Sequence, residues 1–337
     1  MVSTALLEKK LNLKSMTLLI VDGNDFSRTF TRNICRSFNF ADILITSNSK
    51  DALDHLCSTE IDMMVTDWAL KPDWGDVFVR KVRTMPGVRN PYLPIIVLTA
   101  MSDRETAAAA LNAGTNEFMT RPFELRQLLA RFAQVLLNPR PFIRCASYVG
   151  PERRRQQREF EGPDRRAGSN TKQMRPPSVS ATVAKVGRPG GLTIGAMEKA
   201  GAKVIVEEEV RYRDVRRQDL DDLGGLFDRL RQAAAPDQEI VEQIYLKSHA
   251  LKGMGQTFGF PLLTDAGDSL CRMLWKLSPE RSVAPLTLQG VEAHIRTMRL
   301  IVEQDIRHDG GAVGAELISG LRTLVERVAA EGASRPA

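Results

Sequence analysis

The sequence contains few of the residues that build disulfides and metal centres. Its 337 residues include four cysteines and four histidines. Cys35, Cys57, Cys145 and Cys271 are scattered and form no CxxC pair or zinc-ligand spacing, so we expect neither a disulfide framework nor a zinc site. The cysteines are expected to be ordinary buried thiols.

Long hydrophobic runs are also missing. No segment approaches the ~20 consecutive apolar residues that a membrane-spanning helix needs. At the N-terminus, Lys9 and Lys10 lie where a signal peptide would have its apolar centre. We therefore expect no membrane span and a cytoplasmic location.

Signatures of stand-alone enzymes are absent as well. The sequence has no P-loop, no glycine-rich nucleotide loop, no zinc-ligand spacing and no Ser-His-Asp arrangement. It also lacks an ATP-binding kinase region, so the chain cannot phosphorylate itself from ATP. We expect that it is not an enzyme in its own right.

What the sequence does contain begins with five short apolar runs between residues 16 and 138, after an N-terminal tail over 1–15. These runs alternate with longer amphipathic stretches, and they are TLLIV (17–21), DILIT (42–46), DMMVT (62–66), PIIVLT (94–99) and NEFMT (116–120). Runs of this kind are typical of strands buried on both faces. We predict helices beginning near Asn24 or Asp25 and near Ser102, the latter ending at Gly114. The pattern predicts an α/β domain with a doubly wound, five-stranded parallel sheet.

Residues 139–217 show no regular periodicity, and we predict a basic, largely flexible linker there. Between residues 140 and 190 there are twelve Lys or Arg and four Asp or Glu, so the positive excess of the chain is concentrated in this segment. YVGPERRR (148–155) is nearly repeated as FEGPDRRA (160–167). Solvated linker, acidic protein partner, anionic lipid and nucleic acid all remain open for these repeats. No helix-turn-helix pattern favours nucleic acid, and we do not expect it as a partner.

Residues 218–332 carry helical periodicity throughout and predict an all-α antiparallel bundle of the four-helix type. One helix of this bundle contains KSHALKGMGQTFGF, residues 247–260. At about 100° per residue, the apolar residues of this helix lie opposite His249. Lys252, Gly253 and Gln256 lie on the side of His249, which we therefore expect to face solvent, whereas Lys247 falls on the apolar side and would have to extend outward.

Glycine next to the histidine costs helix stability but leaves room for another molecule. Lys252 adds positive charge and Gln256 a hydrogen-bond donor, both of which suit a phosphoryl group. Neutral imidazole is a competent nucleophile near neutral pH. The residues His249, Leu251, Lys252 and Gly253, with Gly259 ten positions after the histidine, resemble the H-x-L-K-G…G signature of histidine-containing phosphotransfer (HPt) domains. This resemblance covers the last ~115 residues and implies that His249 is a phosphoacceptor. His55, His294 and His308 lack such surroundings.

A second candidate site lies where the predicted strands end. Asp22 follows the first strand, Asp67 the third, Thr99 ends the fourth and Arg121 follows the fifth. Carboxyl ends of parallel strands meet at one edge of the sheet, which would bring together carboxylates for a divalent cation, a hydroxyl and a cation for phosphate oxygens.

This arrangement resembles the receiver domain of response regulators, which has a flavodoxin-like fold, with Asp67 as phosphoacceptor and Gly75 at a position where the family usually has glycine. The resemblance implies a Mg²⁺ site at Asp22 and Asp67. Two departures weaken it: Gly23 replaces a second acid, so metal affinity should fall unless Asp25 compensates, and Arg121 replaces the usual lysine.

Together the two resemblances predict a two-component phosphorelay intermediary. His249 would exchange a phosphoryl group with receiver aspartates, and Asp67 would be a possible second acceptor. The implied partners are a sensor or hybrid histidine kinase and a cognate response-regulator receiver. That separate receiver would supply the catalytic carboxylates and Mg²⁺, since the HPt helix needs no cofactor of its own. Two alternatives stay open: a docking module or phosphate sink that regulates a kinase pathway, and a nucleic-acid regulator acting through the basic repeats.

Overall fold

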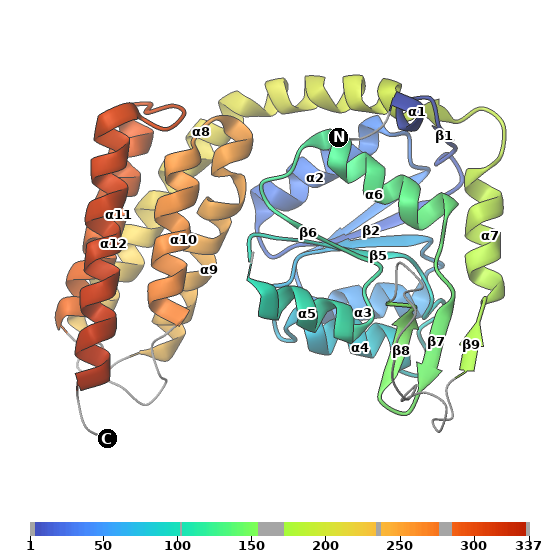
Figure 1. The fold of residues 1–337 in the computed structure, drawn as a ribbon, viewed down its shortest axis with the longest axis horizontal. Helices are drawn as coiled ribbons and strands as arrows, with labels where there is room; N and C mark the ends of the chain where they lie inside the picture. The colour runs from blue at the N-terminus through green and yellow to red at the C-terminus, as the bar shows by residue number, and fades with distance from the viewer. Residues whose placement is uncertain (1–3, 102, 154–171, 234–236, 276–284, 335–337) are drawn as a thin grey trace, which may run out of the picture. The chain divides into compact units, whose positions relative to one another are not determined.

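The computed structural model describes residues 4–101, 103–153, 172–233, 237–275 and 285–334. The chain divides into two compact units, Met1–Val206 and Glu207–Ala337. Each unit is described by itself (Figure 1).

The first unit is built around a parallel five-stranded sheet with the strand order β3-β2-β4-β5-β6. The strands are β2 (Thr17–Val21), β3 (Asp42–Thr46), β4 (Met63–Thr66), β5 (Ile95–Thr99) and β6 (Glu117–Thr120). Counted within the sheet, the order is 2-1-3-4-5, which is that of flavodoxin-like folds. The predicted fold class and all five predicted strands are confirmed.

Five helices cover the two faces of this sheet. They are α2 (Asp25–Ser37), α3 (Ser49–Ser58), α4 (Gly75–Thr84), α5 (Arg104–Ala113) and α6 (Leu125–Leu137). Figure 1 shows α2 and α6 on one face and α3, α4 and α5 on the other. Asn24 caps α2 by accepting a hydrogen bond from the Ser27 amide, and Gly114 ends α5 in the left-handed conformation that glycine tolerates. The helix predicted to start near Ser102 is capped by Asp103 instead.

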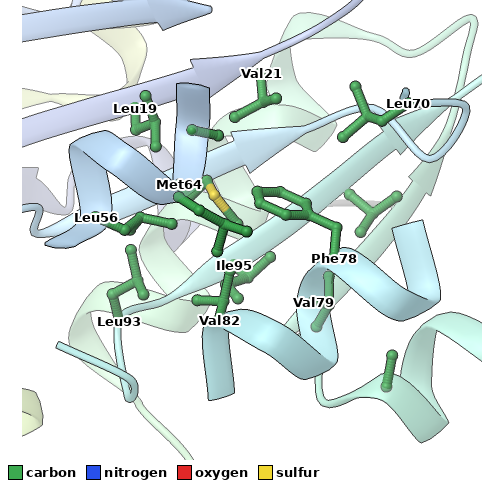
Figure 2. Close-up of a cluster of buried hydrophobic side chains, with 14 of the residues drawn as sticks. Leu19, Val21, Leu56, Met64, Leu70, Phe78, Val79, Val82, Leu93 and Ile95 are labelled. Atoms are coloured by element: carbon green, nitrogen blue, oxygen red, sulfur yellow. The ribbon is translucent and has the colours of Figure 1, made fainter. Parts of the chain in front are cut away.

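A continuous hydrophobic core lies between the sheet and the helices α3 and α4. Leu19, Met64 and Ile95 of the strands belong to this core together with Phe78 and Val82 of α4, and Figure 2 shows these side chains converging. With helices on both faces, each central strand must be apolar on both sides. This requirement explains why the strands appear in the sequence as uninterrupted apolar runs.

The prediction of a flexible linker over residues 139–217 is wrong for most of that segment, because its described residues form regular elements. Within 139–217 the structure has a three-stranded antiparallel sheet, of order β8-β7-β9, and two helices. The elements are β7 (Phe142–Cys145), β8 (Tyr148–Pro151), β9 (Lys172–Met174), α7 (Pro177–Val186), β10 (Leu192–Thr193) and α8 (Ile194–Gln232). The first unit continues to Val206, so most of this segment belongs to the receiver-like unit. The second arginine-rich repeat, and the end of the first, lie outside the described residues.

The described part of the predicted N-terminal tail, residues 4–15, packs within the first unit. After α1 (Thr4–Leu7), strand β1 (Lys10–Leu11) pairs antiparallel with β10. Leu11 and Leu13 are fully buried, and the Asn12 amide donates to the Val186 carbonyl at 3.0 Å. Isolated apolar residues between lysines gave no periodic signal from which this packing could be predicted.

All described elements of the second unit are helices joined by short connections, so the predicted all-helical character of this region is confirmed. It begins within α8 and continues with α9 (Gln238–Gly255), a 3₁₀ turn η1 (Gln256–Phe258), α10 (Pro261–Trp275), α11 (Pro285–Glu303) and α12 (Gly311–Ser334). Helix α10 packs against α9, α11 and α12. Gly259 ends η1 in the left-handed conformation and Pro261 starts α10, a common way to break and restart a helix.

Among the described helices of both units, none combines the length and the hydrophobicity that a transmembrane segment requires.

Candidate functional site

The predicted strand-end residues do meet at one edge of the parallel sheet. Asp22 and Asp67 directly follow the neighbouring strands β2 and β4, and the Asp67 amide donates to the Val21 carbonyl at 2.8 Å. Thr99 ends β5 and Arg121 follows β6, with the Arg121 amide donating to the Thr99 carbonyl at 2.6 Å. All four side chains are buried.

Asp22 is held by three donors. Its Oδ2 accepts from the Arg121 guanidinium at 2.9 Å and from the Ser27 hydroxyl at 2.6 Å, and its Oδ1 accepts from the Asn24 amide at 2.9 Å. Burial raises the pKa of the Asp22 carboxyl above its ordinary value. Arg121 acts in the opposite direction, and the nearby charge of Asp67 raises the pKa further. Asp22, Asp67 and Arg121 therefore form one electrostatic group.

Asp67 is turned toward the following residue and is 6% exposed. Its Oδ1 accepts a hydrogen bond from the Trp68 amide at 2.7 Å. The Thr99 hydroxyl accepts from the Met101 amide at 3.2 Å, which fixes the loop after β5.

Gly75 has a packing role beside this site. A Cβ atom at this position would lie 2.3 Å from the Trp68 ring, so the first residue of α4 must be glycine for the indole to lie across it. The Gly75 amide also donates to the Trp68 carbonyl at 2.9 Å. The glycine thus lets α4 start against the residue that follows Asp67.

The residues at this edge fit a divalent cation poorly. Both oxygens of Asp22 already accept hydrogen bonds, one of them from a guanidinium. Gly23 provides no carboxylate, and Asp25 does not compensate, because its side chain is 89% exposed and pairs with Arg28. Over the described parts of the chain, no group of three or more His, Cys, Asp or Glu could hold a metal.

Ser27 is a site residue that the sequence did not reveal. It lies on the first turn of α2, where the capping Asn24 directs its backbone, and its hydroxyl reaches the Asp22 carboxylate. The one signal available was its position five residues after Asp22 in a helix that starts next to the predicted site.

The prediction that His249 faces solvent is wrong. It lies on α9 and is 5% exposed, with its ring stacked on Tyr245 at a centroid distance of 6.1 Å. The helical-wheel argument assumed that α9 buries a single face. In fact α9 is an inner helix with buried residues around most of its circumference, and Gly253 is among them.

Close packing between α9 and α10 explains much of this burial. Gly267 of α10 comes so near that a Cβ atom there would lie 3.0 Å from Lys252 Cβ and 3.1 Å from the Ser248 carbonyl oxygen. Of the four residues predicted to form the exposed face, Gln256 alone is exposed.

Lys252 is also buried, and its ammonium lies 2.5 Å from an Asp268 carboxylate oxygen. Arg272, largely exposed, pairs with the other oxygen of Asp268. The charge next to His249 is therefore already paired with an acid on α10.

Lys247, which we expected to extend outward, instead bridges two helices. Its ammonium lies 3.0 Å from Asp219 and 2.7 Å from Asp222, both on α8. The hydrogen bond from Lys247 lowers the pKa of Asp222. This pair of contacts fastens the end of α8 to α9.

Comparison with known proteins identifies the first unit. Residues 18–133 match the family model of the response regulator receiver domain, so the doubly wound unit with its acidic edge contains a receiver domain. The chain is 29% identical to chemotaxis protein CheY of Pseudomonas aeruginosa over 120 residues, which are 36% of this chain and 95% of CheY.

Another relative matches far more of the chain. Sensory/regulatory protein RpfC of Xanthomonas campestris pv. campestris is 22% identical over 289 residues, 85% of this chain, although the chain spans 34% of RpfC. Among solved structures, the receiver domain of sensor histidine kinase PA1611 from Pseudomonas aeruginosa is 25% identical with a TM-score of 0.31, covering 35% of this chain and 96% of that domain. The PA1611 structure contains a magnesium ion in its active-site cleft.

Proposed function

We propose that the protein is a phosphorelay intermediary of a two-component system. In this proposal His249 carries a phosphoryl group to or from receiver aspartates, and Asp67 is a second acceptor. The chain acts as a carrier without ATP-binding machinery of its own. It depends on a sensor or hybrid histidine kinase for phosphate and on a cognate response-regulator receiver as its exchange partner, with which it meets in the cytoplasm.

The observation that carries this proposal is the RpfC match combined with the motif around His249. A continuous match over 85% of 337 residues spans about 286 positions, so it includes both Asp67 and His249 wherever it begins. A relationship to a sensory protein therefore extends beyond the receiver domain into α9. Within α9, His249, Lys252 and Gly253 retain the spacing of phosphotransfer domains.

Burial of His249 adds a requirement to the mechanism. An imidazole that is 5% exposed cannot meet an aspartyl phosphate on another protein without movement of its surroundings. The side chain of Tyr245, stacked on the ring, and the neighbouring helix α10 are the groups that have to shift. Transfer to His249 is then gated by this local opening.

The test is to incubate the full chain with a phosphorylated hybrid kinase and to follow label in the wild type, His249→Gln and Asp67→Asn. We expect labelling that is base-stable and acid-labile, as phosphohistidine is, and that disappears in His249→Gln. His308→Gln is the matched control, because His308 is an exposed histidine in the same unit. Label that persists in His249→Gln and vanishes in Asp67→Asn would refute a carrier role for His249.

A docking module or phosphate sink is the second candidate, and two observations favour it: the burial of His249 and the pairing of Asp22 with Arg121. In this alternative the receiver unit binds a kinase without turning over phosphate. A small phosphodonor distinguishes the two, because a docking module leaves Asp67 unlabelled while it still binds the kinase.

A further inference from the structure

The acidic edge of the receiver domain contains a cation that belongs to the protein itself. The Arg121 guanidinium lies 2.9 Å from Asp22 Oδ2, and both side chains are at least nine-tenths buried. We propose that Arg121 takes the place of a divalent cation at this edge, so that the site does not depend on Mg²⁺.

The geometry at Asp22 leaves little for a metal to bind. Mg²⁺ requires near-octahedral oxygen ligands at about 2.0–2.1 Å. Asp22 Oδ2 already accepts from Ser27 and Arg121, and Oδ1 accepts from the Asn24 amide. A metal would have to displace the guanidinium from a buried carboxylate before binding.

The charge balance points in the same direction. The charge of Asp67 is close enough to raise the pKa of the Asp22 carboxyl, which burial also raises, and Arg121 acts in the opposite direction. A second cation about 4 Å from the guanidinium would be repelled by several times the thermal energy at the effective dielectric constant of protein sites.

Among the described residues near Asp22, none restores a metal site. Gly23 supplies no oxygen ligand from a side chain, and Asp25 points to solvent and pairs with Arg28. Space is not the reason for Gly23, since a Cβ there would have one neighbour, the Ser47 carbonyl oxygen, at an ordinary 3.7 Å. The absence of the second acid and the presence of the internal cation thus agree with each other. This inference concerns the receiver site and stands whether or not His249 carries phosphate.

The experiment is a calorimetric Mg²⁺ titration of the full chain, together with thermal melting of the full chain with and without Mg²⁺. We expect no saturable binding and no melting shift for the wild type. Arg121→Gln removes the guanidinium and leaves the charges of Asp22 and Asp67 without it, so this variant should gain the saturable Mg²⁺ binding that the wild type lacks. Its melting temperature should rise with Mg²⁺.

Controls locate the effect. Asp22→Asn combined with Arg121→Gln should lose the Mg²⁺ response, whereas Asp25→Asn should leave the wild-type behaviour unchanged. Submillimolar Mg²⁺ binding by the wild type that Asp22→Asn abolishes would overturn the proposal, and this result needs no Arg121 variant to fold. An Arg121→Gln protein that folds and still ignores Mg²⁺ would overturn it too.

Discussion

Replacing Arg83 with methionine should strongly destabilise the receiver unit. Arg83 lies near the end of α4, and its guanidinium is buried. It donates to the carbonyls of Gly114 at 3.0 Å, Pro91 at 2.7 Å and Leu93 at 2.8 Å, and to Asn116 Oδ1 at 2.9 Å. One side chain therefore joins α4, the loop before β5 and the turn between α5 and β6.

The expected loss can be worked out from what each acceptor keeps. Asn116 Oδ1 still accepts from the Ile95 amide at 2.9 Å, and the bond to the Pro91 carbonyl is partly exposed, so water can replace it. The carbonyls of Gly114 and Leu93 lose a donor in a buried setting. Each such unsatisfied group costs about 1–3 kcal/mol, so the total is about 2–6 kcal/mol. Methionine keeps most of the apolar contact of the arginine stem, so little is added for lost packing.

This change amounts to a large fraction of the ~5–15 kcal/mol by which single domains are stable. Hydrogen exchange of the β5 amides measures it within the receiver unit, because those amides exchange through global opening of the sheet. Arg80→Met is the matched control, as Arg80 is an exposed arginine on the same helix. A difference between Arg83→Met and Arg80→Met below about 1 kcal/mol would refute the reasoning, since it would mean that neither buried carbonyl depends on the guanidinium.

Three further predictions address other parts of the molecule. Gly75→Ala should lower the stability of the receiver unit by about 1–3 kcal/mol and move the Trp68 ring, as measured by melting and near-ultraviolet circular dichroism. Gly225→Ala is the control: this glycine lies within the last two turns of α8 with no atom near its missing Cβ, so the change should be neutral or stabilising by about 0.5–1 kcal/mol. Burial lowers the pKa of His294 below its usual 6.5, so its contribution to the stability of the helical unit should be fully present above pH 6.5 and fall as the pH drops toward the folded-state pKa. His294→Gln should flatten this pH dependence in melting curves measured from pH 7.5 to 5. An equally steep dependence in the variant would contradict the prediction. Lys247→Met should weaken the attachment of the C-terminal half of α8 to α9 and lower the free energy of unfolding by about 0.5–1 kcal/mol, a small value because the partly exposed ion pairs are screened by solvent. Unchanged hydrogen-exchange protection of the α8 amides in this variant would contradict the proposed role of Lys247.

The sheet of the receiver unit could be predicted almost residue by residue, for a physical reason. A strand covered on both faces has to be apolar at every position, so β2 and β5 appear in the sequence as TLLIV and IIVLT. Strand order then brings the ends of these strands together, which is why Asp22 and Asp67 could be placed at one edge before any coordinates. Side-chain partners such as Ser27 lay beyond this logic, since they depend on how a helix begins.

The segment after α6 could not be predicted, because its strands are short and carry no alternation. β7, β8 and β9 have three or four residues each, and they are held in place by contacts with residues that are distant in the sequence. Phe142 of β7 packs edge to face on Tyr92, with ring centroids 5.2 Å apart, and lies under the Arg83 guanidinium. Gly150 of β8 lies so close to Gly114 that a Cβ atom added to Gly150 would be 2.7 Å from the Gly114 Cα. None of these partners is visible in a window of ten residues.

The exposure predicted for His249 is wrong, although the segment that contains it is helical as predicted. The angular positions on α9 were sound, but a helical wheel reports periodicity and not the number of neighbouring helices. Here the apolar stripe of α9 contacts its own core while the opposite side meets α10, which Gly267 allows to approach. A glycine in the facing helix was the one sequence signal for this second contact.

The two candidate phosphoryl sites share one electrostatic arrangement. At each, the cation that could bind phosphate oxygens is paired with a carboxylate that is not the acceptor: Arg121 with Asp22 in the receiver domain, and Lys252 with Asp268 in the helical unit. An incoming phosphoryl group must then replace that carboxylate as the partner of the cation. The exchange keeps the cation paired at every stage, which avoids the cost of several kcal/mol that an unpaired buried cation would impose. In the receiver domain this exchange would leave Asp22 without its cation once phosphate is bound, whereas Asp268 would keep Arg272 as a partner, so we expect the larger rearrangement at Asp22.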